Sequence, residues 1–434
     1  MAAASGFRSG LRLCCSVGRT PSSAPDPMVR LFHQAREGQG ETLVNRILAG
    51  LFAVLLGYTL LRRAGGDSND WLIIGAIFTV VAIFALRESL VANFSQFWPL
   101  LLPPACIALQ LLPSPGHTMA SSLTLAQLAR VIVYLVCFAV AREIASRRPA
   151  WAWGLFAIPL VFGCAEGIFG IAQHAIRGED NYAVGTFPQH SHFAGFVDLL
   201  LPVSIVAAWR YRHPVALAVP MIFFAALLHS FSRAGLVASA LAIVVMVLIR
   251  TRQFKMAGAA ALVLVIAGLV LAPAGLGERF ERISTYAGFH HDAQLTRWQD
   301  TLRLIEARPF LGSGAGTYPI AFAPYNTSSD SLHDHADNDY LQLLAEIGIS
   351  GTLATLALLV LALRRYVRAA RWSLVALGAA GSMIALLAHS LFEFQMYIPA
   401  NVLTLAWIAG VGWGVTMKPP SWPRARRGTG TSIG

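Results

Sequence analysis

One short stretch of the sequence gathers the residue types that transfer protons. The segment HDHADND at 333–339 carries two histidines and three aspartates. A histidine or a carboxylate within hydrogen-bond reach of a reacting hydroxyl can accept its proton. The spacing of His333, His335 and Asp337 is also compatible with a divalent metal site. A third interpretation is an ordinary polar loop in which Asp337 or Asn338 caps the next helix.

Further ionisable residues fall inside or at the ends of apolar runs. Such residues are candidates for a functional role, because a charged side chain within a membrane is energetically costly and is usually found where it has a function or an interaction partner. Glu346 could take part in the chemistry, or it could fix the preceding loop by pairing with an arginine. The same question applies to four others, which are Arg130, Glu166, His389 and Glu393.

The composition identifies the setting of these residues. The chain has 434 residues, of which 56% are hydrophobic and 13% charged, and its mean hydropathy is +0.59. Soluble domains carry about 25% charged residues, so too few charges are present to cover a water-facing surface. The apolar runs recur along the whole chain, which predicts a polytopic membrane protein. A soluble enzyme, a secreted disulfide scaffold and a disordered chain are excluded.

The net charge of +11 does not indicate nucleic-acid binding. The basic residues form short clusters between apolar runs, as topology signals do, and not one continuous surface. We therefore expect no nucleic-acid partner. Most clusters fall on the same side if the helices alternate, which makes that side cytoplasmic and places both termini there.

The predicted fold is an all-α polytopic membrane protein with about 12 transmembrane helices and one long extracytoplasmic loop. The helices are expected near 43–61, 71–86, 97–112, 125–140, 151–174, 192–209, 214–231, 234–249, 256–276, 340–363, 372–394 and 399–415. Pro103-Pro104 is expected to break the third.

Five segments follow from this pattern. Residues 1–41 lack the apolar core of a signal peptide and predict a disordered cytoplasmic tail. Residues 42–276 hold helices one to nine, and 340–415 hold the last three. Residues 277–339 form the long loop, which contains short helices because Leu295, Trp298, Leu302 and Ile305 recur at helical spacing. Residues 416–434 are a basic cytoplasmic tail.

The loop and its surroundings resemble the O-antigen ligase and O-antigen polymerase superfamily of bacterial envelope enzymes. The resemblance is carried by four ordered pieces within about residues 160–355: TFPQHSHFAGF, FSRAG, the pair Arg297-Trp298 followed by ARPFLGSGAG, and NDYLQLLAEIGISG. One difference concerns a residue of the site. The family usually has His-Asn before the Tyr-Leu run, and this chain has Asp337-Asn338.

The resemblance implies a membrane-embedded glycosyltransferase in the bacterial inner membrane, with its active loop in the periplasm. Such enzymes move a glycan from a polyprenyl-pyrophosphate carrier to an acceptor hydroxyl, on a lipid A core or a growing glycan. Arg233 and Arg297 are the expected pyrophosphate ligands, because guanidinium groups bind phosphate oxygens bidentately. His335 or Asp337 is the expected catalytic base, and Asn338, Glu346 and His333 support it. His190 and His192 could contact sugar.

The resemblance implies no cofactor and no metal, since the donor is already activated. Both arginines also have interpretations without a function. Arg233 could be a helix-end residue whose guanidinium group extends to the membrane surface, and Arg297 could be a solvated charge on the loop helix. Two other functions stay open. One is a secondary transporter of the bicarbonate-transporter kind, and the other is a non-catalytic scaffold for polysaccharide assembly.

Overall fold

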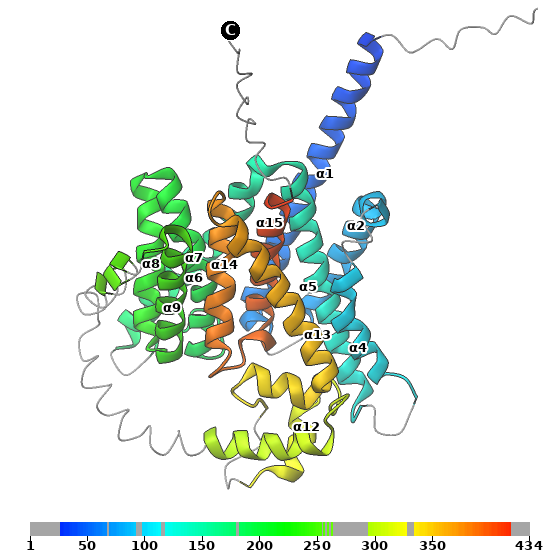
Figure 1. The fold of residues 1–434 in the computed structure, drawn as a ribbon, viewed down its shortest axis with the longest axis vertical. Helices are drawn as coiled ribbons and strands as arrows, with labels where there is room; N and C mark the ends of the chain where they lie inside the picture. The colour runs from blue at the N-terminus through cyan, green and yellow to red at the C-terminus, as the bar shows by residue number, and fades with distance from the viewer. Residues whose placement is uncertain are drawn as a thin grey trace, which may run out of the picture. The chain divides into compact units, whose positions relative to one another are not determined.

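The computed structural model describes residues 27–66, 69–92, 98–113, 118–178, 182–253, 294–327 and 334–417, with short pieces between 255 and 263. These residues form helices joined by turns, and they contain no strand. The chain divides into two compact units, Met1–Asn45 and Arg46–Gly434, and helix α1 (Pro27–Leu61) runs through the boundary. All elements that position the site belong to the second unit (Figure 1).

Eleven of the twelve expected spans have a helical counterpart. Seven are long and apolar enough to cross a membrane, and four are shorter apolar helices. Besides α1, the α-helices are α2 (Trp71–Ala92), α4 (Leu102–Gln110), α5 (Ser121–Arg147), α6 (Ala152–Arg177), α7 (His190–Tyr211), α8 (Pro214–Ser230), α9 (Arg233–Thr251), α12 (Tyr318–Phe322), α13 (Asp339–Ala369), α14 (Leu374–His389) and α15 (Pro399–Val415). The short 3-10 helices are η1 (Arg63–Gly65), η2 (Trp98–Leu101), η3 (Pro149–Trp151), η4 (Ala323–Tyr325) and η5 (Gln395–Tyr397). The polytopic all-α class is therefore confirmed, whereas the number twelve is not.

Several boundaries differ from the prediction for physical reasons. Helix α1 begins at Pro27, well before the expected residue 43, and the expected span 256–276 lies largely outside the described residues. The expected helix 372–394 ends at His389, so the last five of its residues belong to a connecting loop. Pro103 and its neighbour stand in the first turn of α4, where a missing N–H costs no helical hydrogen bond.

Helix α13 is two helices in succession, because Gly348 interrupts it with φ 63° and ψ −174°. An unbroken apolar pattern runs through this position, so hydrophobicity alone predicted one span over 340–363. The interruption divides α13 into a short first helix of residues 339–347 and a longer second part. Glu346 lies in the last turn of the short helix, two residues before the break.

Helix α7 is the centre of the helical bundle. It is almost entirely buried and packs against α8, α9 and α14, while α15 packs along α5. Its one deeply buried carboxyl group, Asp198, lies 2.7 Å from Nδ1 of His389 and accepts a 2.5 Å hydrogen bond from the Ser239 hydroxyl. This buried polar network ties α7, α9 and α14 together.

The arginine-rich ends of the helices meet at one end of the bundle. Arg250, in the last turn of α9, donates to the carbonyl of Ala370 beyond α13. Arg365 of α13 donates to the Thr416 hydroxyl beyond α15. The opposite ends of α9 and α13 begin at Arg233 and Asp339, and segment 294–327 lies at that other end, at the bottom of Figure 1.

Candidate functional site

A large cavity that holds several charged and polar side chains lies where the first residues of α7, α9 and α13 come together. Its volume is about 1530 Å³. The helix at 294–307, the segment 334–337 and the connection between α14 and α15 complete its wall. The cavity therefore joins the long loop to the transmembrane helices.

The cavity brings together most of the site residues predicted from the sequence. Arg233, Arg297, His335, Asp337 and Glu346 all line it. Asn338 is not among the lining residues, and His333 lies outside the described residues. Segments separated by about a hundred residues in the sequence thus contribute to one site.

Arg297 and Asp337 form an ion pair at the cavity wall. The guanidinium Nη1 of Arg297 contacts Oδ2 of Asp337, and the side chain of Arg297 is only 12% exposed. The backbone of Asp337 has φ 49°, a left-handed conformation that aspartate tolerates better than most residues. Gln294 donates to its carbonyl at 3.2 Å. Asp337 is thus held by helix 294–307 through both its backbone and its carboxylate.

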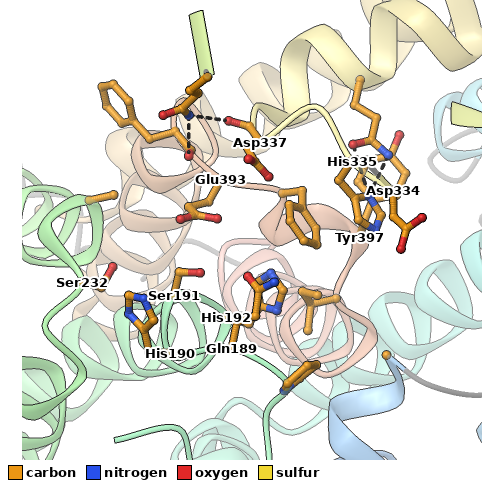
Figure 2. A pocket seen from close by; sticks show the side chains of 18 of the residues that line it. Gln189, His190, Ser191, His192, Ser232, Asp334, His335, Asp337, Glu393 and Tyr397 are labelled. Atoms are coloured by element: carbon orange, nitrogen blue, oxygen red, sulfur yellow. Dashed lines mark hydrogen bonds between the residues drawn. The ribbon is translucent and has the colours of Figure 1, made fainter. Parts of the chain in front are cut away.

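His335 is packed between aromatic rings and an amide. Its ring stacks on Phe394 with centroids 3.9 Å apart, and Nδ1 lies 2.9 Å from Nε2 of Gln342 (Figure 2). Burial lowers the pKa of His335 to about 4, so its imidazole is neutral at pH 7. A neutral ring of this kind can accept a hydrogen bond, but it is a weak base.

Asn338 is the N-cap of α13, as the helix-cap interpretation predicts. Its side-chain oxygen accepts from the backbone N–H groups of Tyr340 and Leu341 at 3.0 and 3.1 Å, and its amide donates to the carbonyl of Leu391. Asp339 accepts a hydrogen bond from the backbone N–H of Met396 at 2.9 Å. These two residues fasten the first turn of α13 to the connection between α14 and α15.

Glu346 holds the glycine-rich turn of the loop against the break in α13. Its carboxylate accepts from the backbone N–H groups of Gly316 and Tyr318, at 2.8 and 3.1 Å, and from the Tyr397 hydroxyl at 2.9 Å. The side chain is almost fully buried. Glu346 therefore fixes the loop as one interpretation expected, although backbone and hydroxyl donors take the place of the expected arginine.

The turn and the break fit each other because both lack side chains at the contact. Gly312 and Gly348 have φ of 73° and 63°, and a Cβ on either would overlap the backbone opposite. Ser313 and Gly314 donate to the carbonyls of Ala345 and Glu346, which the break leaves without helical partners, at 2.9 Å each. The GSGAG turn thus replaces the lost helical hydrogen bonds.

The first turn of α7 supplies two histidines to the cavity. His190 stacks on Tyr182 at 4.4 Å between ring centroids. His192 is 2% exposed, and neither of its ring nitrogens has a hydrogen-bond partner among the residues that the structure describes. Buried polar groups nearly always have a partner, so both ring nitrogens of His192 are available to water or to another molecule in the cavity.

Three arginines line the cavity, and they differ in how they are engaged. Arg297 is paired with Asp337, and Arg130 of α5 donates to the side chains of Asn69 and Gln127. Arg233 begins α9 after its N-cap Ser232, is exposed, and has no acidic partner within the described part of the chain. Arg233 is therefore the cation most available to an anionic ligand.

Glu393 is a second carboxyl group in the cavity, beside Asp337. It belongs to the connection after α14, and Figure 2 places its side chain between Asp337 and Ser191. The Ser191 hydroxyl hydrogen-bonds it. Burial, reinforced by the negative charge of Asp337, raises the pKa of Glu393 to about 8. This carboxyl group therefore titrates near neutral pH.

Two other ionisable residues that lie in apolar runs, Glu166 and His389, have contacts that stabilise the fold. Glu166 accepts from the backbone and hydroxyl of Thr186 at 2.9 and 3.0 Å, which fixes the segment before α7. His389 pairs with Asp198 in the bundle core. Sequence reasoning gave no role to Ser191, Tyr182 or Tyr397, because isolated hydroxyl and aromatic residues in a hydrophobic chain carry no signal.

Among the described residues, no group of three His, Cys, Asp or Glu side chains is arranged as metal ligands.

The fold and the cavity together define a polytopic membrane protein with a polar site at the loop end of its bundle. Residues 217–356 match the family model described as O-Antigen ligase, which supports the resemblance of this part of the chain to the O-antigen ligase and polymerase superfamily. No curated protein matches the sequence. The family match supports a role of the ligase or polymerase type in polysaccharide assembly.

Proposed function

We propose that this protein is a membrane glycosyltransferase that moves a glycan from a polyprenyl-pyrophosphate carrier to an acceptor hydroxyl. The observation that carries the proposal is the convergence of Arg233, Arg297 and two carboxyl groups on one cavity. That cavity is open between the long loop and the helix ends. A donor with a lipid tail and a charged pyrophosphate head requires a binding site that lies between the membrane-spanning helices and the loop.

In this proposal Arg233 and Arg297 bind the pyrophosphate. The carbon–oxygen bond to the phosphate breaks during transfer, and negative charge develops on the leaving oxygen. A guanidinium group stabilises this charge with two parallel hydrogen bonds. Arg233 is free to do so at once, while Arg297 must share its charge between the ligand and Asp337.

His192 and His190 contribute hydrogen bonds to the sugar or the phosphate. The two ring nitrogens of His192 have no partner in the described part of the chain, which supports this assignment because a neutral imidazole can both donate to and accept from a hydroxyl. The proton of the acceptor hydroxyl goes to an acidic or imidazole group beside Arg297. His335 and Asp337 are the groups predicted from the sequence, and Glu393 is a third in the same cavity.

We place the cavity on the periplasmic side of a bacterial inner membrane, with both termini in the cytoplasm. The support is the arginine-rich opposite end, since loops that stay in the cytoplasm carry an excess of Lys and Arg. A lipid-linked glycan on the periplasmic leaflet then has direct access to the cavity. No cofactor takes part, because the pyrophosphate bond already activates the sugar.

A deletion strain complemented with the wild type or with Arg233→Ala tests the function. We expect the deletion and the variant to lose long surface glycan and to accumulate lipid-linked glycan. Long accumulated chains indicate a ligase acting on a lipid A core, and single repeat units indicate a polymerase acting on a growing glycan. An unchanged surface glycan profile in the deletion strain would refute the proposal in favour of transport or scaffolding.

A further inference from the structure

The contacts of the two predicted bases limit what either can do. Asp337 is already engaged with Arg297, and its carboxylate is oriented by that pair. His335 is stacked on Phe394 and bound to Gln342 through Nδ1. Protonation of Asp337 would weaken its ion pair with Arg297, and His335 is a weak base because burial lowers its pKa to about 4.

Glu393 has neither restriction. Its carboxyl group faces the cavity, has no ion-pair partner among the described residues, and has Ser191 as its hydrogen-bond donor. It lies on the connection between α14 and α15, which Asn338 and Asp339 bind to the first turn of α13. The carboxyl group is therefore positioned by a firmly attached segment.

We propose, on the basis of the glycosyltransferase function above, that Glu393 is the catalytic base and that Asp337 is a positioning residue that orients Arg297. The acceptor oxygen forms the new bond to the anomeric carbon, and its proton moves to the Glu393 carboxylate. The bond from that carbon to the pyrophosphate oxygen breaks, and its electron pair leaves with polyprenyl pyrophosphate. Water then takes the proton from Glu393. Asp337 and Arg297 do not exchange protons in this step.

The charged groups around Glu393 suit this role. Asp337 and Asp339 oppose its ionisation and Arg297 favours it. With a pKa of about 8, Glu393 is a stronger base than an ordinary carboxylate and is still partly ionised at neutral pH. Removal of the negative charge of Asp337 lowers this pKa. The titration of Glu393 is thus a measurable property that depends on its proposed neighbours.

The test uses the full chain in liposomes, with lipid-linked glycan extracted from the deletion strain. Acceptors are lipid A core and the lipid-linked glycan itself. Glu393→Gln keeps the shape of the side chain and its contact with Ser191. We expect this variant to lose at least roughly 100-fold in rate with little change in KM, because general base catalysis contributes about 10²–10⁴-fold to the rate. Glu306→Gln, on the exposed face of helix 294–307, is the matched control and should retain full activity.

The wild-type rate should rise with pH and level off near 8. Infrared titration of the purified protein should show a protonated carboxyl band that disappears near pH 8 and is missing in Glu393→Gln. In Asp337→Asn the band should disappear at lower pH, whether or not the variant is active. A Glu393→Gln rate within threefold of the wild type would refute the role of Glu393, as would a band unmoved by Asp337→Asn. No transfer by the wild type with either acceptor would instead refute the proposed function.

Discussion

Replacement of Glu346 by alanine should destabilise the whole loop end of the bundle. The carboxylate accepts hydrogen bonds from two backbone N–H groups and the Tyr397 hydroxyl, all within 3.1 Å. The Glu346 side chain is 1% exposed, and the truncation leaves the buried N–H of Tyr318 without this partner. Gly316 and Tyr397 line the cavity, where water can replace the carboxylate. An unsatisfied buried donor costs about 1–3 kcal/mol, so we expect a loss of at least about 1 kcal/mol in the free energy of unfolding.

The assay is equilibrium unfolding of the purified chain in detergent micelles, with Glu306→Ala as the matched control. Glu306 is exposed on the same loop, and an exposed substitution of this kind changes stability by only about 0.5 kcal/mol. Hydrogen exchange should show that the GSGAG turn and the start of α13 lose protection together in Glu346→Ala. A Glu346→Ala free energy equal to that of the control would refute the idea that this carboxylate holds the turn.

Four further outcomes follow from the site. Arg233→Ala should lower glycan transfer by roughly 10- to 100-fold, as the loss of a charged hydrogen bond predicts, while Arg210→Ala at the other end of α7 leaves the rate unchanged. Gly348→Ala should cost at least about 1 kcal/mol of stability by calorimetry, because φ is 63° there. In a cysteine-free background, Glu306→Cys should react with an impermeant maleimide from the periplasm. The pKa of Glu393 is raised from an ordinary 4.5 to about 8, so the wild type loses stability as the pH rises between these two values. In thermal unfolding at a series of pH values, Glu393→Gln should lose less stability over this range than the wild type.

The sequence predicted the helices better than their ends. Apolar runs place most spans because a membrane-crossing helix needs a long apolar stretch. The same criterion extends α14 to residue 394 and hides the interruption of α13. Both errors have one cause, since hydropathy does not register the hydrogen bonds that end a helix. The glycine at 348 is visible in the sequence, but the turn that completes its unpaired carbonyls is not.

The residues of the site were partly predictable for a similar reason. Arg233, Arg297, His335 and Asp337 belong to motifs with recognisable order, and all four line the cavity. Their mutual contacts could not be predicted, because residue types do not reveal that Arg297 is already paired. Glu393 was a suspect only as an ionisable residue in an apolar run. Its place beside Asp337 follows from the early end of α14, which the sequence pattern conceals.

The central claim is tested most directly by reconstituted transfer. Purified wild-type protein in liposomes receives radiolabelled lipid-linked glycan, with lipid A core added to one sample and withheld from the other. We predict that glycan bound to the acceptor and free polyprenyl pyrophosphate appear in equal amounts, and that both fall by roughly 10- to 100-fold with Arg233→Ala. Release of polyprenyl pyrophosphate without an acceptor-linked product, or no release in either sample, would contradict the assignment of this cavity as a glycosyltransferase site.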